Sequence, residues 1–181
     1  RVRVVVDSTG RLNRLKKLDA FFSDSGEYDL KILYLTRDSR GVVHSASKKG
    51  YKSGPKPSVI RASLSWWFRN RQMLHFLRNV PASRMLQISY EQFCLGPEKT
   101  LNRIFRFLGV RETGYPRTWK QIPHHTFAGN YLLRKSRKTD IIMDQAWRDN
   151  LKPWEKLAIN VITGRLNQKL GNRVLYLPPV E

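Results

Sequence analysis

The sequence predicts an α/β domain in which helices flank a parallel sheet, and three features of the chain indicate it. Apolar runs at residues 2–6, 30–35 and 84–88 have the length and composition of buried strands. Amphipathic segments, with apolar residues at helical spacing, separate these runs. Strand, helix and strand in that order form a βαβ unit, whose two strands run parallel.

The first half of the chain supplies two of the strands and two helices. The run VRVVV stops at Asp7, and residues 11–22 carry Leu and Phe at helical spacing, so we expect a helix there. The loop SDSGEYD leads to the second strand, LKILYL. Beyond a loop rich in Gly, Pro and Lys, a long helix is expected from about Ser58 to Asn79.

The second half supplies the remaining elements. We expect a third strand and then three helices, at residues 84–89, 97–108, about 140–150 and 153–169. Gly109 suits the end of the first of these helices, and Pro153 suits the first turn of the last. Residues 110–138 are predicted to be irregular. The chain has no internal repeat, so we interpret residues 1–181 as a single domain.

The charge of the chain is strongly positive. Its 181 residues include 34 Lys and Arg against 14 Asp and Glu, a net charge of +20. Such a field attracts nucleic acid, an acidic lipid surface, a phosphorylated cofactor, or a sulfated or acidic polymer. The alternative is a solvated basic face without a single partner. Charge alone does not choose among these.

Cysteine and histidine usage excludes some kinds of site. The single cysteine, Cys94, excludes an internal disulfide and a Cys-based zinc site, and the four histidines lack a metal-ligand pattern, so no metal is predicted. No apolar run approaches the ~20 residues of a membrane span, and no signal-peptide pattern opens the chain. Because Arg1 stands at the edge of a predicted strand, we expect the natural protein to begin further upstream.

Polar residues follow each predicted strand, at 7–9, 36–38 and 89–91. In open α/β sheets, ligands bind beyond the carboxyl ends of the strands. Arg37 stands where its planar guanidinium can hold a phosphate through two hydrogen bonds. If a helix begins after it, the Ser45 hydroxyl reaches the same phosphate from about two turns along. The alternative for Arg37 is a local ion pair with Asp38 that caps the helix.

Four segments, in order, resemble sulfotransferases that use 3′-phosphoadenosine 5′-phosphosulfate. LYLTRDSRGVVHS is similar to the segment in which an Arg and a Ser eight residues later hold the 3′-phosphate, here Arg37 and Ser45. VVVDSTGRLNRL resembles a strand end of the pattern DSSK. LQISYEQFCLGPEKTLNRIFRFLGV resembles the segment whose Tyr lies beside the adenine, here Tyr90. HHTFAGNYLLRKSRKTDIIMDQAWRDNL resembles a further phosphate-binding segment and implies four ligands, Gly129, Asn130, Arg134 and Lys135.

The resemblance implies a P-loop-like sulfotransferase fold and transfer of a sulfuryl group from that donor to a hydroxyl or amine, leaving 3′,5′-adenosine bisphosphate. The acceptor is not readable from the sequence, and a carbohydrate is one candidate. Nucleic acid is disfavoured as a partner because its binding needs no polar residues at the strand ends. The alternatives are a non-catalytic sulfotransferase-like domain and a module that binds nucleic acid or another anionic polymer. Bacterial members of the family are cytoplasmic and animal carbohydrate-modifying members are Golgi proteins; the single cysteine favours the cytoplasm.

The chain departs from the family pattern in three respects. It has no match to the PKSGTT-like loop that grips the 5′-phosphosulfate, so the first strand, loop and helix of the fold are expected to be missing from it. Gly10 stands where the DSSK pattern has lysine. Arg134 stands five residues after Gly129, one more than in the commonest bacterial pattern, and Ser136 replaces the glycine of the family's RKG motif. The sequence therefore predicts the 3′-phosphate and adenine side of the site and assigns no catalytic residue. His44 is expected to face away from Ser45.

Overall fold

The computed structural model describes residues 4–8, 10–25, 28–49, 55–111 and 141–171, and the structural statements below concern these residues. The elements are α1 (Leu12–Ser25), β1 (Ile32–Thr36), α2 (Ser39–Lys49), α3 (Val59–Leu77), a 3-10 turn (Ala82–Arg84), β2 (Met85–Ser89), α4 (Tyr90–Leu95), α5 (Pro97–Leu108), α7 (Trp147–Asn150) and α8 (Pro153–Lys169).

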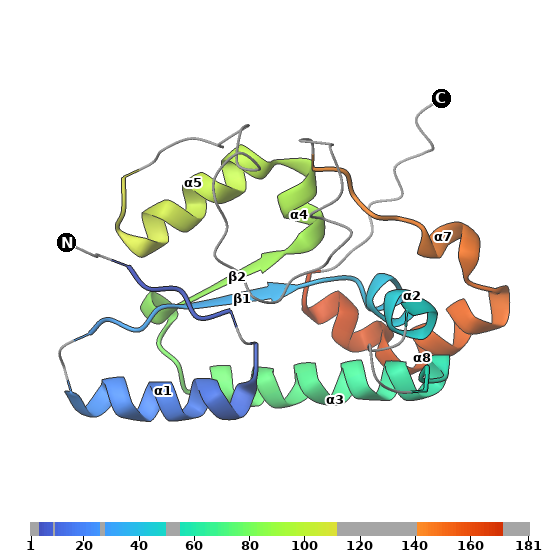
Figure 1. Cartoon of the computed structure of the whole chain (residues 1–181), viewed down its shortest axis with the longest axis horizontal. Helices are drawn as coiled ribbons and strands as arrows, with labels where there is room; N and C mark the ends of the chain where they lie inside the picture. Colours follow the sequence, from blue (N-terminus) through green and yellow to red (C-terminus); the bar gives the residue numbers. More distant parts are fainter. Residues whose placement is uncertain (1–3, 9, 26–27, 50–54, 112–140, 172–181) are drawn as a thin grey trace.

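The two strands lie side by side and run parallel, which confirms the predicted α/β class. The register pairs Ile32 with Met85 and continues to Thr36, which pairs with Ser89. Figure 1 shows the strands in a middle layer, with α4 and α5 on one side and α3 on the other. Helices on both faces are the usual covering of a parallel sheet, because each face must be buried.

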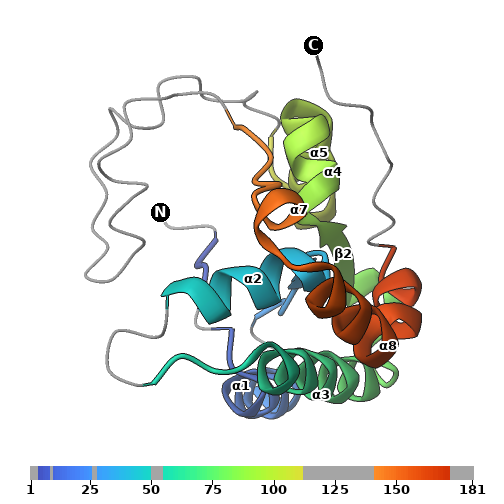
Figure 2. The same cartoon turned by 90° about the vertical axis from the view of Figure 1, so that its right-hand side faces the viewer.

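One face of the sheet packs on a core formed with α3 and the end of α8. Ile32 and Tyr34 of β1 are buried there against Trp66, Leu77 and Leu170. A second cluster of buried residues joins α2 to α3, α7 and α8, and it consists of Val43, Val59, Ala62, Trp147, Leu151 and Ile159. Figure 2 shows α2 lying close to α3, α7 and α8. This packing fixes α2, the helix that follows β1.

The other face of the sheet is covered unevenly. Leu86 and Ile88 of β2 are buried, and β2 contacts both α4 and α5. Their register partners on β1, Leu33 and Leu35, are 42% and 66% exposed. Within the described part of the chain, the helices on this face therefore cover β2 and leave β1 open.

The strand predicted at residues 2–6 is wrong for the part that the structure describes. Residues 4–8 have no regular secondary structure, and Val5 and Val6 are 87% and 78% exposed. A Val-rich run forms a strand only where a sheet edge accepts its hydrogen bonds. In the described chain β1 pairs with β2 alone, so composition predicted a strand that has no partner there.

Local signals placed three helices well. Ser58 caps α3, because its hydroxyl accepts a hydrogen bond from the Arg61 backbone nitrogen at 3.3 Å. Gly109 ends α5 in the left-handed conformation (φ 65°), and Pro153 occupies the first turn of α8. No helix in the described part is long and apolar enough to cross a membrane.

The helix predicted at residues 140–150 is mostly wrong. Only α7, four residues long, is helical, and residues 141–145 are not. Asp144 explains the difference, since its carboxylate and backbone make hydrogen bonds outside any helix, as described below. Of the stretch predicted to be irregular, 110–138, only its first two residues are described.

Candidate phosphate-binding site

The carboxyl ends of β1 and β2 bring two of the predicted site residues together. Thr36 and Ser89 are register partners at the last position of each strand, so the residues that follow them, Arg37 and Tyr90, emerge at the same edge. The Arg37 guanidinium lies over the Tyr90 ring, with its central carbon 4.4 Å from the ring centroid. This cation–π contact holds the guanidinium against the Tyr90 ring.

Asp144 is the third member of this group, and the sequence did not single it out. Nη2 of Arg37 donates to the Asp144 carboxylate at 3.0 Å and to the Asp144 carbonyl at 3.2 Å. The Asp144 backbone nitrogen donates to the Tyr90 hydroxyl at 3.0 Å. The sequence signal was local, an Asp three residues before a short helix, and it could not reveal partners 107 and 54 residues away.

Gly41 places the guanidinium on a particular face of α2. A β-carbon at Gly41 would lie 3.0 Å from Nε of Arg37, so the guanidinium rests against the bare backbone of the helix. Residues 41 and 45 are four apart on α2, which makes them neighbours on one helix face, about 5–6 Å apart at their β-carbons. Ser45 therefore lies one turn from Gly41, on the face of α2 that Arg37 contacts at Gly41.

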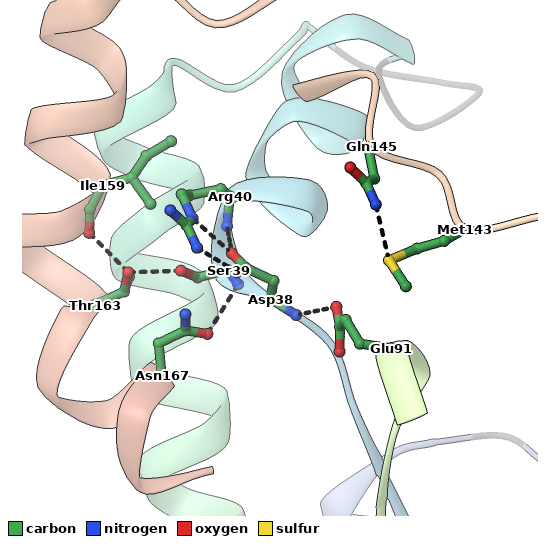
Figure 3. A network of polar contacts seen from close by, with 9 residues as sticks. All are labelled: Asp38, Ser39, Arg40, Glu91, Met143, Gln145, Ile159, Thr163 and Asn167. Carbon is green, nitrogen blue, oxygen red and sulfur yellow. Dashed lines mark hydrogen bonds and ion pairs between the residues drawn. The ribbon is translucent and has the colours of Figure 1, made fainter. Parts of the chain in front are cut away.

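The alternative that Arg37 pairs locally with Asp38 does not hold, because Asp38 has another partner (Figure 3). Nε and Nη2 of Arg40 donate to the two Asp38 carboxylate oxygens at 3.0 and 2.7 Å, and the Arg40 backbone nitrogen donates to Oδ1 at 2.8 Å. The carboxylate therefore caps the start of α2, as expected, but with Arg40 as its ion pair. Arg37 is left to Asp144.

The backbone at the carboxyl end of β1 is held by a buried network. The Asp38 nitrogen donates to Glu91 Oε1 at 2.9 Å, and the Ser39 nitrogen donates to Asn167 Oδ1 at 3.0 Å. The Ser39 and Thr163 hydroxyls are 2.8 Å apart and hydrogen-bonded. Figure 3 shows these side chains arriving from α4 and α8 around the turn. The position of Arg37 is fixed because the residues directly after it are anchored.

The surroundings of the site shift the pKa values of Asp144 and Tyr90 in opposite directions, so Asp144 is ionised and Tyr90 is neutral. Burial alone would raise the pKa of the Asp144 carboxyl. Hydrogen bonds from Arg37 and from the Ala146 nitrogen oppose this effect and outweigh it, so the pKa lies below its ordinary value. Burial raises the pKa of the Tyr90 phenol, which stays protonated. Asp144 therefore presents a carboxylate to Arg37 at every pH near neutrality.

His44 is buried in the structure. It is 7% exposed, and burial, followed by the positive charges of Lys48 and Arg37, lowers its pKa while the Asp144 charge opposes the change. Its Nε2 is buried without a hydrogen-bond partner in the described structure. His44 is thus a neutral imidazole near enough to Arg37 and Asp144 for their charges to affect its pKa.

The remaining predicted ligands, Gly129, Asn130, Arg134 and Lys135, lie outside the described residues. Among the described residues, no group of three His, Cys, Asp or Glu could hold a metal ion. What the described group offers is a guanidinium whose Nε and Nη1 donate no hydrogen bond to any described residue, on a helix face that also carries a serine. That combination suits an oxyanion.

Comparison with known proteins shows the family of the chain. The model of the sulfotransferase family matches residues 12–114 of the chain, more than half of its length. The chain belongs to the sulfotransferase family. The matched span contains Arg37, Ser45 and Tyr90.

Two curated relatives match most of the chain. It is 30% identical over 131 residues to protein-tyrosine sulfotransferase 1 of Danio rerio and 27% identical over 132 residues to protein-tyrosine sulfotransferase 2 of Gallus gallus. Each match covers 68% of this chain but only 35% and 34% of the relative. The chain thus spans about a third of the length of these relatives.

Two solved structures share the fold. The sulfotransferase domain from the Synechococcus PCC 7002 olefin synthase matches with a TM-score of 0.61 and 25% identity, covering 82% of this chain and 50% of that domain. The sulfotransferase domain from the curacin biosynthetic pathway matches with a TM-score of 0.51 and 20% identity, covering 76% and 53%. The predicted sulfotransferase fold is confirmed.

Proposed function

We propose that this chain forms the 3′-phosphate and adenine side of a sulfotransferase site for 3′-phosphoadenosine 5′-phosphosulfate. The observation that carries the proposal is the convergence of Arg37, Tyr90 and the Ser45 face of α2 at the carboxyl edge of a parallel sheet. A 3′-phosphate is an oxyanion that a guanidinium and a hydroxyl hold together, and charge-assisted hydrogen bonds of this kind are the strong ones. The net charge of +20 speeds capture of such a ligand.

Transfer would proceed by in-line displacement at sulfur. The acceptor oxygen forms a bond to sulfur as the bond from sulfur to the 5′-phosphate oxygen breaks, and 3′,5′-adenosine bisphosphate leaves with that oxygen. The proton of the acceptor goes to a base that lies beyond the residues assigned here. The donor side contributes by holding the nucleotide in one place, which turns the reaction into a positioned encounter.

The acceptor we propose is a hydroxyl, and the relatives named protein-tyrosine sulfotransferases make a tyrosine side chain the first to test. A strongly basic chain favours tyrosines within acidic peptide sequences. A radiolabelled-sulfate assay with an acidic tyrosine peptide, its phenylalanine counterpart and a sugar acceptor separates the choices. Label on the sugar alone would overturn the tyrosine proposal.

The donor proposal is tested by calorimetry with 3′,5′-adenosine bisphosphate and adenosine 5′-monophosphate. Arg37→Ala should weaken binding of the bisphosphate by about 2 kcal/mol, the scale of a hydrogen bond to a charged group. The monophosphate should bind both proteins alike. Arg69→Ala, which removes the same charge from an exposed position on α3, is the matched control. Equal weakening by both substitutions, or equal affinity for the two nucleotides, would overturn the proposal.

A further inference from the structure

Asp144 contacts two of the three described residues that the proposed function places against the nucleotide, Arg37 and Tyr90. Its carboxylate and carbonyl accept hydrogen bonds from Nη2 of Arg37, at 3.0 and 3.2 Å. Its backbone nitrogen donates to the Tyr90 hydroxyl at 3.0 Å. The side chain of Asp144 is 51% exposed, so this is not a pair hidden in the core for stability. Exposed ion pairs contribute little to folding stability, so stability alone does not explain the pair between Asp144 and Arg37.

Asp144 is itself held by the core. Its Oδ1 accepts a hydrogen bond from the Ala146 nitrogen at 3.1 Å, at the point where α7 begins. The next residue, Trp147, is 8% exposed and packs in the cluster shared by α2, α3 and α8. The carboxylate therefore has a fixed position relative to α2, although the side chain stands at the surface.

Arg37 needs such a constraint. The Tyr90 ring centroid lies 4.4 Å from the central carbon of the guanidinium, and the Gly41 backbone lies close to its Nε and Nη2. Neither contact is a hydrogen bond, so neither sets the direction of the N–H groups. The hydrogen bonds to Asp144 are directional and both use one nitrogen, Nη2, so they set the direction in which Nε and Nη1 point.

We propose that Asp144 is a specificity-determining residue that aims the free donors of Arg37 at a phosphate on the 3′ oxygen of the ribose rather than on the neighbouring 2′ oxygen. This inference rests on the proposed function. The Asp144 charge also repels any phosphate nearby, so its removal changes affinity in two opposing ways. The preference for the 3′-phosphate over the 2′-phosphate is therefore the quantity that reports its role, since the repulsion acts on both ligands.

The test is calorimetry with adenosine 3′,5′-bisphosphate, adenosine 2′,5′-bisphosphate and adenosine 5′-monophosphate. The wild-type chain should prefer the 3′,5′ isomer. Asp144→Asn should reduce that preference about fivefold, the upper range for an exposed ion pair, because Arg37 can then reach either phosphate. Asp144→Asn keeps Oδ1 as the acceptor for Ala146, so α7 keeps its start. Asp149→Asn, which removes the same charge from an exposed position on α7, should leave the preference unchanged.

Two further variants separate position from charge and from the proposed function. Asp144→Glu keeps the charge but moves the carboxylate by one methylene, and it should reduce the preference as Asp144→Asn does. In an Arg37→Ala background, Asp144→Asn should change the preference no further, because the two residues act through one group. An unchanged preference in both Asp144 variants overturns this inference and leaves the proposed function standing. A preference that survives Arg37→Ala overturns the proposed function and the inference with it.

Discussion

Two arginines at the carboxyl end of β1, Arg37 and Arg40, use the same chemistry for different ends. Each pairs with an aspartate and each lies over an aromatic ring, Tyr90 at 4.4 Å and Trp147 at 4.3 Å. Arg40 directs two nitrogens to Asp38, whose side chain is 3% exposed. Arg37 directs one nitrogen to Asp144, whose side chain is 51% exposed.

The difference teaches which arginine can serve a ligand. In the inner pair, Arg40–Asp38, two nitrogens of the arginine donate to a carboxylate that is closed off from solvent, and that carboxylate also caps α2. In the outer pair, Arg37–Asp144, Nε and Nη1 of the arginine donate no hydrogen bond to any described residue, and the pair lies at an edge that solvent reaches. An arginine in an ion pair is thus available for binding only when the pair leaves part of its fork unused.

Breaking the inner pair should have the largest effect on stability. Asp38→Asn removes a buried charge that Arg40 contacts through two side-chain nitrogens, and broken buried pairs cost about 3–5 kcal/mol. Urea unfolding should show a loss of this size. The matched change in the outer pair, Asp144→Asn, should cost less than about 1 kcal/mol. Equal losses would show that burial does not distinguish the two pairs.

Asn167, which holds the backbone next to the inner pair, should give the next largest effect on stability. Asn167→Ala takes away the acceptor of the Ser39 backbone nitrogen, a residue that is 1% exposed. A buried donor without a partner costs about 1–3 kcal/mol, so the free energy of unfolding should fall by about 2 kcal/mol. Binding of 3′,5′-adenosine bisphosphate, measured on the folded fraction, should be unchanged. A selective loss of nucleotide affinity would contradict the division between an anchoring and a binding arginine.

Tyr90→Phe sharpens the description of the outer pair. The ring remains to stack on Arg37, but the hydroxyl that accepts from the Asp144 nitrogen is gone. We expect a stability loss of about 1 kcal/mol, the net worth of one hydrogen bond, measured by urea unfolding. The stack should persist, so Tyr90→Ala should weaken nucleotide binding more than Tyr90→Phe does. The reverse order would show that the hydroxyl, not the ring, holds Arg37.

The smallest expected effect is on the pH dependence of folding stability, through His44, whose pKa responds to the charges of Arg37 and Asp144. The pKa of His44 in the folded chain lies below the ordinary value of 6.5, so as the pH falls the unfolded chain binds a proton more readily than the folded chain does. The contribution is fully present above pH 6.5 and is lost as pH falls through the lowered value. Unfolding followed between pH 7.5 and pH 5 should therefore show declining stability, with a smaller decline in His44→Gln. Asp144, whose pKa is also lowered, acts in a separate window below about pH 4.

Sequence patterns located the elements whose signals are local. The strands at 32–36 and 85–89 and the helices α3, α5 and α8 were predicted within a few residues, because periodicity and caps such as Ser58 and Gly109 lie within the element itself. The predictions failed for residues 4–6 and 141–145, where the outcome depended on a distant partner. One run had the composition of a strand without an edge to pair with, and the other lost its helix to contacts with Arg37 and Tyr90.

The sequence by itself determined that Arg37 and Tyr90 follow parallel strands, and that Gly41 and Ser45 share a face of the next helix. Topology and the helical repeat dictate these facts, whatever the packing. Only the tertiary structure decided which carboxylate each arginine holds. Asp38 caps the start of α2 and pairs there with Arg40, two residues further along the chain, so it is not the partner of Arg37. The partner of Arg37 then comes from 107 residues away, because packing of Trp147 in the core brings Asp144 to the end of the sheet.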